Sequence, residues 1–237
     1  MECFVNTRGY SQDYSWVNDG DCSQNIGFLD TWLENELDEP TLRLYGHQNS
    51  YYLLIMRVPS GRYDQFGRSI RSYWVFKSEE DDEGKLRALI AIFLNDREVF
   101  FKQLNECIGE SSINPEFAIN WKRLWNYIGL GFKMRDEGCR KLLTDERKSM
   151  VAKNNELNRR MLFSLLKRYK LPMEQGLLLV VGDAMMEQLA QQSNLWRALC
   201  VSESSQDWRA LEVAPKRKKC FGKVKKWLAG LAMLLWI

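Results

Sequence analysis

The sequence predicts an α+β fold, in which a mostly antiparallel sheet comes first and a helical region follows it. In residues 1–77, short runs rich in aromatic and β-branched residues alternate with glycine and polar residues, as strands and turns do. From residue 84 onward the apolar residues recur at helical spacing. A continuous apolar run, GLLLVVG at 176–182, predicts a late strand that returns to the sheet.

The strand-rich part divides into short segments. A helix is predicted at 26–37, where apolar residues have helical spacing before Pro40. The glycine- and proline-containing segment PSGRYDQFGR, 59–68, predicts a loop. The expected strands are CFVNTR (3–8), DYSWV (13–17), TLRLYG (41–46), SYYLLIMRV (50–58) and IRSYWVFK (70–77).

The helix-rich part starts after the acidic run SEEDDEG, 78–84. This run predicts a solvated connection or the start of the next helix, since negative charge favours the helix dipole there. A last strand is expected at WRALCV, 196–201. The expected helices are KLRALIAIFLND (85–96), REVFFKQLNECI (97–108), PEFAINWKRLWNYIGL (115–130), residues 145–169 and AMMEQLAQQ (184–192).

The chain has 237 residues and 45% hydrophobic content, which is enough for one sizeable core. We predict a single domain over 1–200, strand-rich over 1–77 and helix-rich over 84–200. A polar linker over 201–215 and a basic–apolar tail helix over 216–237 are expected after it. The first residues contain no apolar signal-peptide region, so a cytoplasmic location is expected.

The sequence offers little for catalysis. It contains no phosphate-binding GxxxxGK[ST] loop, no GxSxG and no HExxH. Its six cysteines are far apart, and its one histidine, His47, stands in a predicted turn. We therefore expect no catalytic residues, no metal site and no cofactor, and favour a non-enzymatic protein.

Two segments carry arginines in a setting of glycine and aromatic residues: RGYSQDY at 8–14 and GRYDQFGRSIR at 61–71. Guanidinium groups held in such loops could bind a phosphate or a carboxylate bidentately. The alternative is that the arginines pair with acidic residues of the same region. The candidate ligand-binding residues are Arg8, Arg62, Asp64, Arg68 and Arg71.

The same two segments resemble accessory domains of bacterial conflict systems. The resemblance covers less than a tenth of the chain. It implies an effector or accessory protein of a defence system, with the arginine-rich loops binding a phosphate-bearing ligand.

Charge is distributed in blocks. Residues 1–120 carry 11 Lys/Arg against 20 Asp/Glu, whereas residues 121–170 carry 14 against 5. Basic helices over 121–170 could bind nucleic acid, but a solvated helix face is the commoner role of such charges. The apolar residues of the first basic helix have core spacing, and we expect them to be buried: Trp121, Leu124, Trp125 and Ile128.

The tail, 216–237, has seven Lys and Arg followed by eleven uncharged residues from Trp227. Eleven helical residues reach about 16 Å, too short to span a hydrocarbon core of about 30 Å. The tail could enter one leaflet of an anionic membrane, pack on its own domain, or dock on a partner. Cys220 is a candidate acylation site. The expected contact residues are Lys223, Lys225, Lys226, Trp227, Leu231, Leu234, Leu235 and Trp236.

The sequence therefore predicts a cytoplasmic interaction or adaptor module that its tail brings to a membrane surface or a protein assembly. In the membrane case it would be peripheral on the inner face. The alternatives are the defence-system effector described above and, more weakly, nucleic-acid binding through 121–170.

Overall fold

The computed structural model describes residues 1–20, 39–112, 116–131, 139–140, 147–182, 189–192 and 194–211. The helices are η1 (Glu80–Asp82), α2 (Glu83–Asn95), α3 (Arg97–Asn105), α4 (Trp121–Gly131) and α5 (Glu156–Arg168). The strands are β1 (Glu2–Thr7), β2 (Ser15–Asn18), β3 (Thr41–His47), β4 (Ser50–Tyr63), β5 (Ser69–Glu79), β6 (Ile108–Glu110), β7 (Phe117–Ile119), β8 (Met150–Lys153), β9 (Gly176–Gly182), β10 (Arg197–Cys200) and β11 (Arg209–Ala210).

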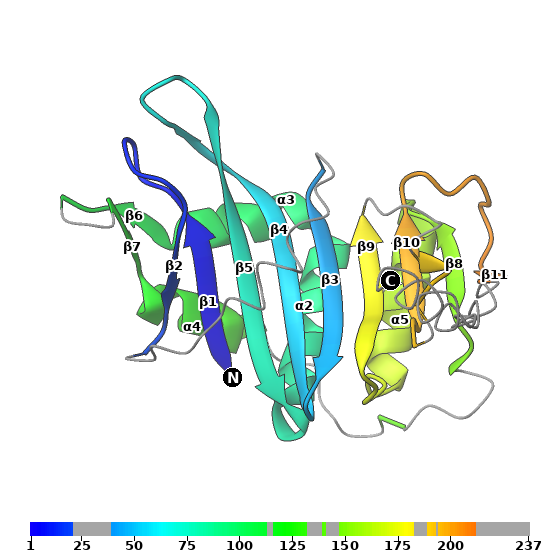
Figure 1. The fold of residues 1–237 in the computed structure, drawn as a ribbon. Helices are drawn as coiled ribbons and strands as arrows, with labels where there is room; N and C mark the ends of the chain where they lie inside the picture. The colour runs from blue at the N-terminus through cyan, green and yellow to red at the C-terminus, as the bar shows by residue number, and fades with distance from the viewer. Residues whose placement is uncertain are drawn as a thin grey trace, which may run out of the picture.

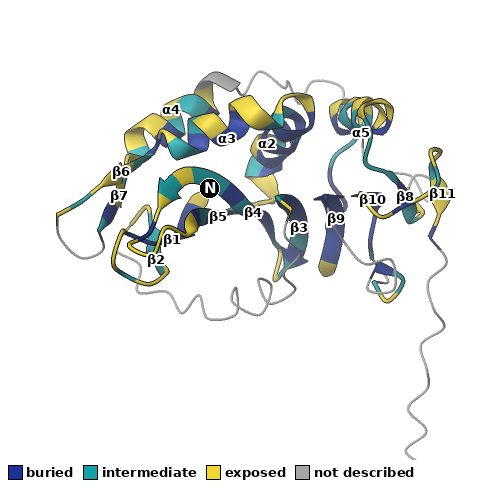
Figure 2. Ribbon diagram, turned by 90° about the horizontal axis from the view of Figure 1, so that it is seen from above, coloured by how far each residue is buried: buried dark blue, intermediate teal, exposed yellow. Residues whose placement is uncertain are grey.

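Nine of these strands form one sheet in the order β11-β8-β10-β9-β3-β4-β5-β1-β2 (Figure 1). The part from β3 to β2 is antiparallel, whereas β8, β10 and β9 are parallel to one another. The late strand β9 pairs antiparallel with β3 and so joins the two parts. Figure 2 shows α2, α3, α4 and α5 on one face of the sheet. The fold is thus α+β, and the predicted return of the late strand is confirmed.

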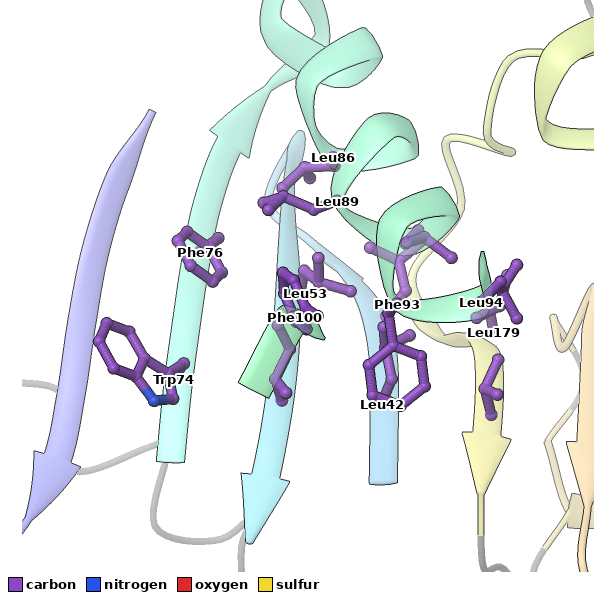
Figure 3. Close-up of a cluster of buried hydrophobic side chains, with 14 of the residues drawn as sticks. Leu42, Leu53, Trp74, Phe76, Leu86, Leu89, Phe93, Leu94, Phe100 and Leu179 are labelled. Carbon is purple, nitrogen blue, oxygen red and sulfur yellow. The ribbon is translucent and has the colours of Figure 1, made fainter. Parts of the chain in front are cut away.

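The main core lies between the helices and the sheet. Alternate side chains of the strands, such as Leu42, Leu53 and Phe76, point toward the helices, as the two-residue period of a strand requires (Figure 3). Leu86, Leu89 and Phe93 of α2 meet them with helical spacing. This shared apolar layer holds α2 against the centre of the sheet.

A buried ion pair ties α2 to α5. Nε of Arg87 lies 2.7 Å from an oxygen of Glu83, and both side chains are at most 4% exposed. A guanidinium N–H of Arg87 donates to the carbonyl of Leu166, and Glu83 accepts the backbone N–H of Leu171, 2.7 Å away. The two charges are therefore satisfied by each other, by the last turn of α5 and by the chain that follows it.

Most predicted strands are confirmed, and β3 and β4 form the predicted pair. His47, which was expected in the turn, is the last residue of β3 and pairs with Ser50. Gln48 and Asn49 have φ values of 48° and 63°. Two left-handed residues in succession match a two-residue hairpin turn, which follows the twist of the strands.

The predicted loop at 59–68 begins too early, because β4 continues to Tyr63, whereas its predicted end agrees with the start of β5 at Ser69. The register of this pair shifts between Ile55 and Val58 and again between Pro59 and Tyr63. Such irregularities accommodate the proline and Gly61, which has a φ of 70°. The hairpin is consequently longer than the sequence indicates.

The helix expected at 97–108 ends at Asn105, before β6, and two other predicted helices begin too early. The helix expected at 115–130 begins only at Trp121, after β7, because Asn120 caps it: its side chain accepts the N–H of Arg123. The helix expected at 145–169 contains β8 and then α5, and Asn155 caps α5 by accepting the N–H of Asn158. In both places the local preference of asparagine for a cap starts the helix late.

Several predictions fall outside the described residues or remain untested. The helix at 26–37 and most of the helix at 184–192 lie outside the described residues. The predicted domain boundaries stay predictions. Residues 201–211 of the predicted linker are part of the fold: they contribute β11 to the sheet edge and include the buried Glu203 and Leu211. Within the described part of the chain, no helix is long and apolar enough to cross a bilayer.

Candidate functional site

The two arginine-bearing segments of the sequence meet at one end of the sheet. The loop 8–14 joins β1 to β2, and the turn 64–68 joins β4 to β5, whose hairpin extends beyond the neighbouring strands (Figure 1). A backbone hydrogen bond of 2.9 Å from Gln65 to the carbonyl of Tyr10 links the two loops directly. We call this surface, residues 8–14 and 63–68, the aromatic–arginine tip.

Asp64 is the centre of the tip. Its side chain is only 1% exposed, and its Oδ1 accepts the backbone N–H groups of Phe66 and Arg68, both at 2.9 Å. Its Oδ2 lies 2.7 Å from Nε of Arg68 and 3.3 Å from a guanidinium nitrogen of Arg8. Burial alone would raise the pKa of Asp64, but the backbone and side-chain hydrogen bonds from Arg68, with that from Phe66, hold it below its ordinary value.

Arg8 of the tip and Arg62, which directly precedes it, also have partners. The Nε of Arg8 donates to the carbonyl of Gln12 at 2.9 Å, and its side chain is 10% exposed. Arg62 donates to the carbonyl of Arg8 at 3.2 Å and to the hydroxyl of Thr7 at 2.8 Å. These guanidinium groups therefore act as internal cross-links between the two loops.

The loop 8–14 is held from a second side by Glu116. The backbone N–H of Ser11 donates to this carboxylate at 2.7 Å, and the hydroxyl of Ser11 donates to its other oxygen. Hydrogen bonds from Ser11 lower the pKa of Glu116. A side chain at Gly9 would place its Cβ 2.2 Å from the Cβ of Glu116, so this close approach requires glycine.

What the tip presents to solvent is aromatic. Among the described residues, every aromatic side chain that is classed as exposed lies here: Tyr10, Tyr14, Tyr63 and Phe66. Tyr10, Tyr63 and Phe66 are 63–71% exposed, and Arg68 lies over the Phe66 ring at 5.1 Å. Tyrosine and arginine are enriched at the centres of protein interfaces, where rigid aromatic side chains lose little entropy on binding.

The structure thus brings together four of the five predicted ligand-binding residues: Arg8, Arg62, Asp64 and Arg68. Arg71 is linked to this group through its backbone. The N–H of Arg71 donates to the Tyr14 hydroxyl, and the carbonyl of Arg71 accepts from the Thr7 hydroxyl. Arg8 and Arg68 contact Asp64, as the alternative interpretation predicts, and Arg62 contacts a backbone carbonyl and the Thr7 hydroxyl. Each of these residues has a role in holding the tip together.

A second exposed apolar surface lies along α5. Leu157 and Met161, one helical turn apart, are 64% and 45% exposed. They line a groove of about 450 Å³ between α5 and the sheet edge that β8 and β11 form. We call it the α5 groove. Its lining residues are Met150, Leu157, Arg160, Met161, Ser164, Leu165, Arg168, Arg197 and Trp208.

The floor of the α5 groove is fixed by a stacked arginine. Arg197 lies 5.0 Å from the Trp196 ring and 5.9 Å from the Trp208 ring, and donates to the carbonyls of Lys148 and Trp196 at 2.7 Å. Because Arg197 is only 8% exposed, it determines the shape of the groove and adds little positive charge to its surface. Arg160 pairs with Glu156 on α5.

A smaller cavity of about 260 Å³ lies at the carboxyl ends of the parallel strands β8 and β9. Gly182 and Asn154 line it with Asp96 and Arg159, and such edges often bind ligands in sheets with parallel strands. The acidic residues of its lining, Asp96 and Glu98, are matched by the basic residues Arg97 and Arg159. The contacts of these side chains do not direct them toward one common point. The cavity therefore indicates no particular ligand.

The groups that the tail would contribute, and Cys220, lie outside the described residues. Of the residues expected to be buried in α4, Leu124 and Ile128 are buried, while Trp121 and Trp125 are half-buried against the core. No group of His, Cys, Asp and Glu among the described residues is arranged to hold a metal ion.

Comparison of the chain with protein-family models, curated proteins and solved structures finds no match.

Sequence reasoning missed the α5 groove. Leu157 and Met161 have the i, i+4 spacing of a core face, and a helix read from 145 onward assigns every apolar side chain to packing. A signal for the groove was nevertheless present in the sequence: this helix has more apolar positions than one buried face needs. Leu162 and Leu166 are fully buried, so they already supply a face toward the sheet, and Leu157 and Met161 fall outside it.

Proposed function

We propose that this chain is a non-enzymatic interaction module whose aromatic–arginine tip contacts a partner protein. The observation that supports it most is the gathering of Tyr10, Tyr63 and Phe66 on one rigid projection. Each of these side chains is more than half exposed, and apolar surface gathered in this way is typical of interaction sites. The Asp64 network holds the tip in one shape before binding, which lowers the entropy cost of association.

The paired state of the arginines favours protein contact over a phosphate-bearing ligand. A phosphate would have to displace Asp64 from Arg8 and Arg68, and would leave that carboxylate buried without its partners. The exposed rings of Tyr10, Tyr63 and Phe66, by contrast, could enter a pocket on a partner while the Asp64 network stays intact. The defence-system effector role is compatible with such a module, and its ligand-binding form has less support.

The basic–apolar tail, 216–237, is proposed to bring the module to an anionic membrane surface. Each lysine or arginine near such a surface contributes about 1 kcal/mol of attraction, and the apolar end adds burial in the leaflet. The half-buried Trp121 and Trp125 pack on the core, which leaves less aromatic surface for stacking on nucleic acid. Nucleic-acid binding by 121–170 is consequently the weakest of the alternatives.

The tip proposal is tested by quantitative co-purification of the full-length chain from its native cells, after nuclease treatment. The test variant carries Tyr10→Ser, Tyr63→Ser and Phe66→Ser, and the control carries Val99→Ser and Met173→Ser, exposed apolar residues on other surfaces. We expect at least one protein retained by the wild type and the control to fall about tenfold in the tip variant, since interface aromatics contribute about 2 kcal/mol or more. Identical partner sets from all three chains would refute the proposal.

The tail proposal has its own measurement. Neutralising Lys223, Lys225 and Lys226 to alanine should weaken sedimentation with vesicles of anionic lipid and leave the melting temperature unchanged. Binding that persists unchanged in the variant, or that requires no anionic lipid, would contradict an electrostatic role for the tail.

A further inference from the structure

The described part of the chain ends beside the α5 groove. β11 pairs with β8, with Ala210 opposite Met150, and the next residue, Leu211, donates its N–H to the carbonyl of Ser149 at 2.9 Å. Met150 and Trp208, which flank this exit point, both line the groove. The chain after Leu211 therefore starts from the rim of this apolar groove.

The chain that follows has the length and composition to fill it. Residues 212–226 form a connection of 15 residues, whose root-mean-square span is about 21 Å when flexible. The segment 227–237, WLAGLAMLLWI, has no charge and no polar side chain other than the two indoles. As a helix it would be about 16 Å long, close to the length of about 20 Å of α5 itself.

We propose that residues 227–237 dock into the α5 groove, against Leu157, Met161 and Leu165, whenever no membrane or partner holds them. An uncovered segment of this composition would be an aggregation hazard in water. The groove lies beside the point where the connection starts, and covalent attachment gives the segment an effective concentration in the millimolar range there. The groove and the segment cover each other's apolar surface.

Charge explains why such docking would be reversible. The connection carries seven Lys and Arg at 216–226, and the groove is rimmed by Arg160 and Arg168, with Lys167 on the next exposed position of α5. Glu156, which pairs with Arg160, is the acidic residue of this helix. The arginines at the rim of the groove repel the basic connection, although the apolar groove attracts the apolar end. An anionic membrane, by contrast, attracts the connection electrostatically and takes up the apolar end in its leaflet. An anionic membrane would therefore compete with the groove for the segment.

The test uses the full chain in a Cys220→Ser background, with one cysteine placed in the segment and one on the domain. The docked pair is Met161→Cys with Leu231→Cys, and the control pair is Val99→Cys with Leu231→Cys, which uses an exposed apolar position on α3. Mild oxidation at low protein concentration is followed by peptide mapping. We expect the intramolecular bridge of the docked pair to form at least about tenfold faster than that of the control pair.

Equal bridging rates in the two pairs, or a bridge that links two chains, would overturn the proposal. A second measurement needs no cysteine: chymotryptic cleavage within 227–237 should accelerate several-fold in the double variant Leu157→Ser and Met161→Ser. Unchanged cleavage in that variant, with its melting temperature preserved, would also contradict docking.

Adding vesicles of anionic lipid to the first assay separates this inference from the proposed membrane role. Slower bridging of the docked pair with vesicles supports both claims. Fast bridging that ignores the vesicles supports the groove and contradicts the membrane role. Absence of fast bridging in either condition overturns the groove, whatever the sedimentation assay shows.

Discussion

The aromatic–arginine tip and the α5 groove both expose large apolar side chains, but they do so in opposite shapes. The tip is a projection on a hairpin, and its rings stand outward on backbone that hydrogen bonds hold in place. The groove is concave, and its apolar walls come from a helix and a sheet edge. A projection of rigid rings suits insertion into a partner, whereas a groove suits the reception of a segment.

The two surfaces also rest on different ionic anchors. In the tip, the buried Asp64 pairs with Arg68, whose side chain is 63% exposed. Behind the groove, Glu83 and Arg87 are both buried and hold α2 to the chain around the end of α5. The first anchor fixes a loop at the surface, and the second joins two layers of the core. Breaking them should therefore have different consequences for the fold.

The largest expected effect is that of Glu83→Ala. It leaves Arg87, fully buried, without its carboxylate, and such uncompensated charges cost about 3–5 kcal/mol. Denaturant unfolding should show this loss of free energy. The matched control is Lys85→Ala, which removes the exposed ion pair with Asp82 and should change stability by less than about 1 kcal/mol. A Glu83→Ala loss as small as that of the control would show that the pair does not anchor α5.

Asp64→Asn should loosen the tip without unfolding the domain. The amides of Phe66 and Arg68 lose a charged acceptor, so their hydrogen-exchange protection should fall about tenfold while that of β4 and β5 stays unchanged. Asp13→Asn is the control, because the side chain of Asp13 is fully exposed and 4.0 Å from Arg8. Equal protection in the two variants would mean that Asp64 does not organise the turn.

The same substitution gives a pH prediction. Because the pKa of Asp64 is lowered in the folded protein, its ionised form contributes stability above the ordinary aspartate value of about 3.9, and this contribution is lost as the pH falls through the lowered pKa. The difference in melting temperature between wild type and Asp64→Asn should be constant from about pH 7 to 5 and shrink below about pH 4. A difference that persists undiminished well below that pH would contradict the assignment.

Phe66→Ser should have the smallest effect on stability, within about 0.5 kcal/mol, because the ring is 71% exposed. Phe76→Ser, at a fully buried position of β5, is the destabilising counterpart. Thermal melts of the two variants compare them directly. A large loss in Phe66→Ser would mean that the ring packs within the fold and is not available to a partner.

The sequence predicts the fold class and most of the strands, because period-two runs such as that of β5 and the apolar run of β9 are strong local signals. It also singles out the two segments that meet in the tip. It does not predict that Asp64 is the shared acceptor, since this depends on a contact between β1 and β5 that brings Arg8 beside the turn. β8 was hidden inside a helical pattern for the same reason: its pairing with β10 is remote in the chain. The α5 groove is bounded by β8 and could not be predicted without it.

The central claim is that the tip contacts a partner protein, and site-directed photo-crosslinking tests it most directly. A photo-reactive residue replaces Phe66 in the full-length chain, and a second chain carries it at Val99 as a comparison of similar exposure. After irradiation of native cells, we expect position 66 to give a discrete crosslinked protein product that Asp64→Asn reduces and that position 99 does not give. The same products from both positions, or none from position 66, would contradict the account.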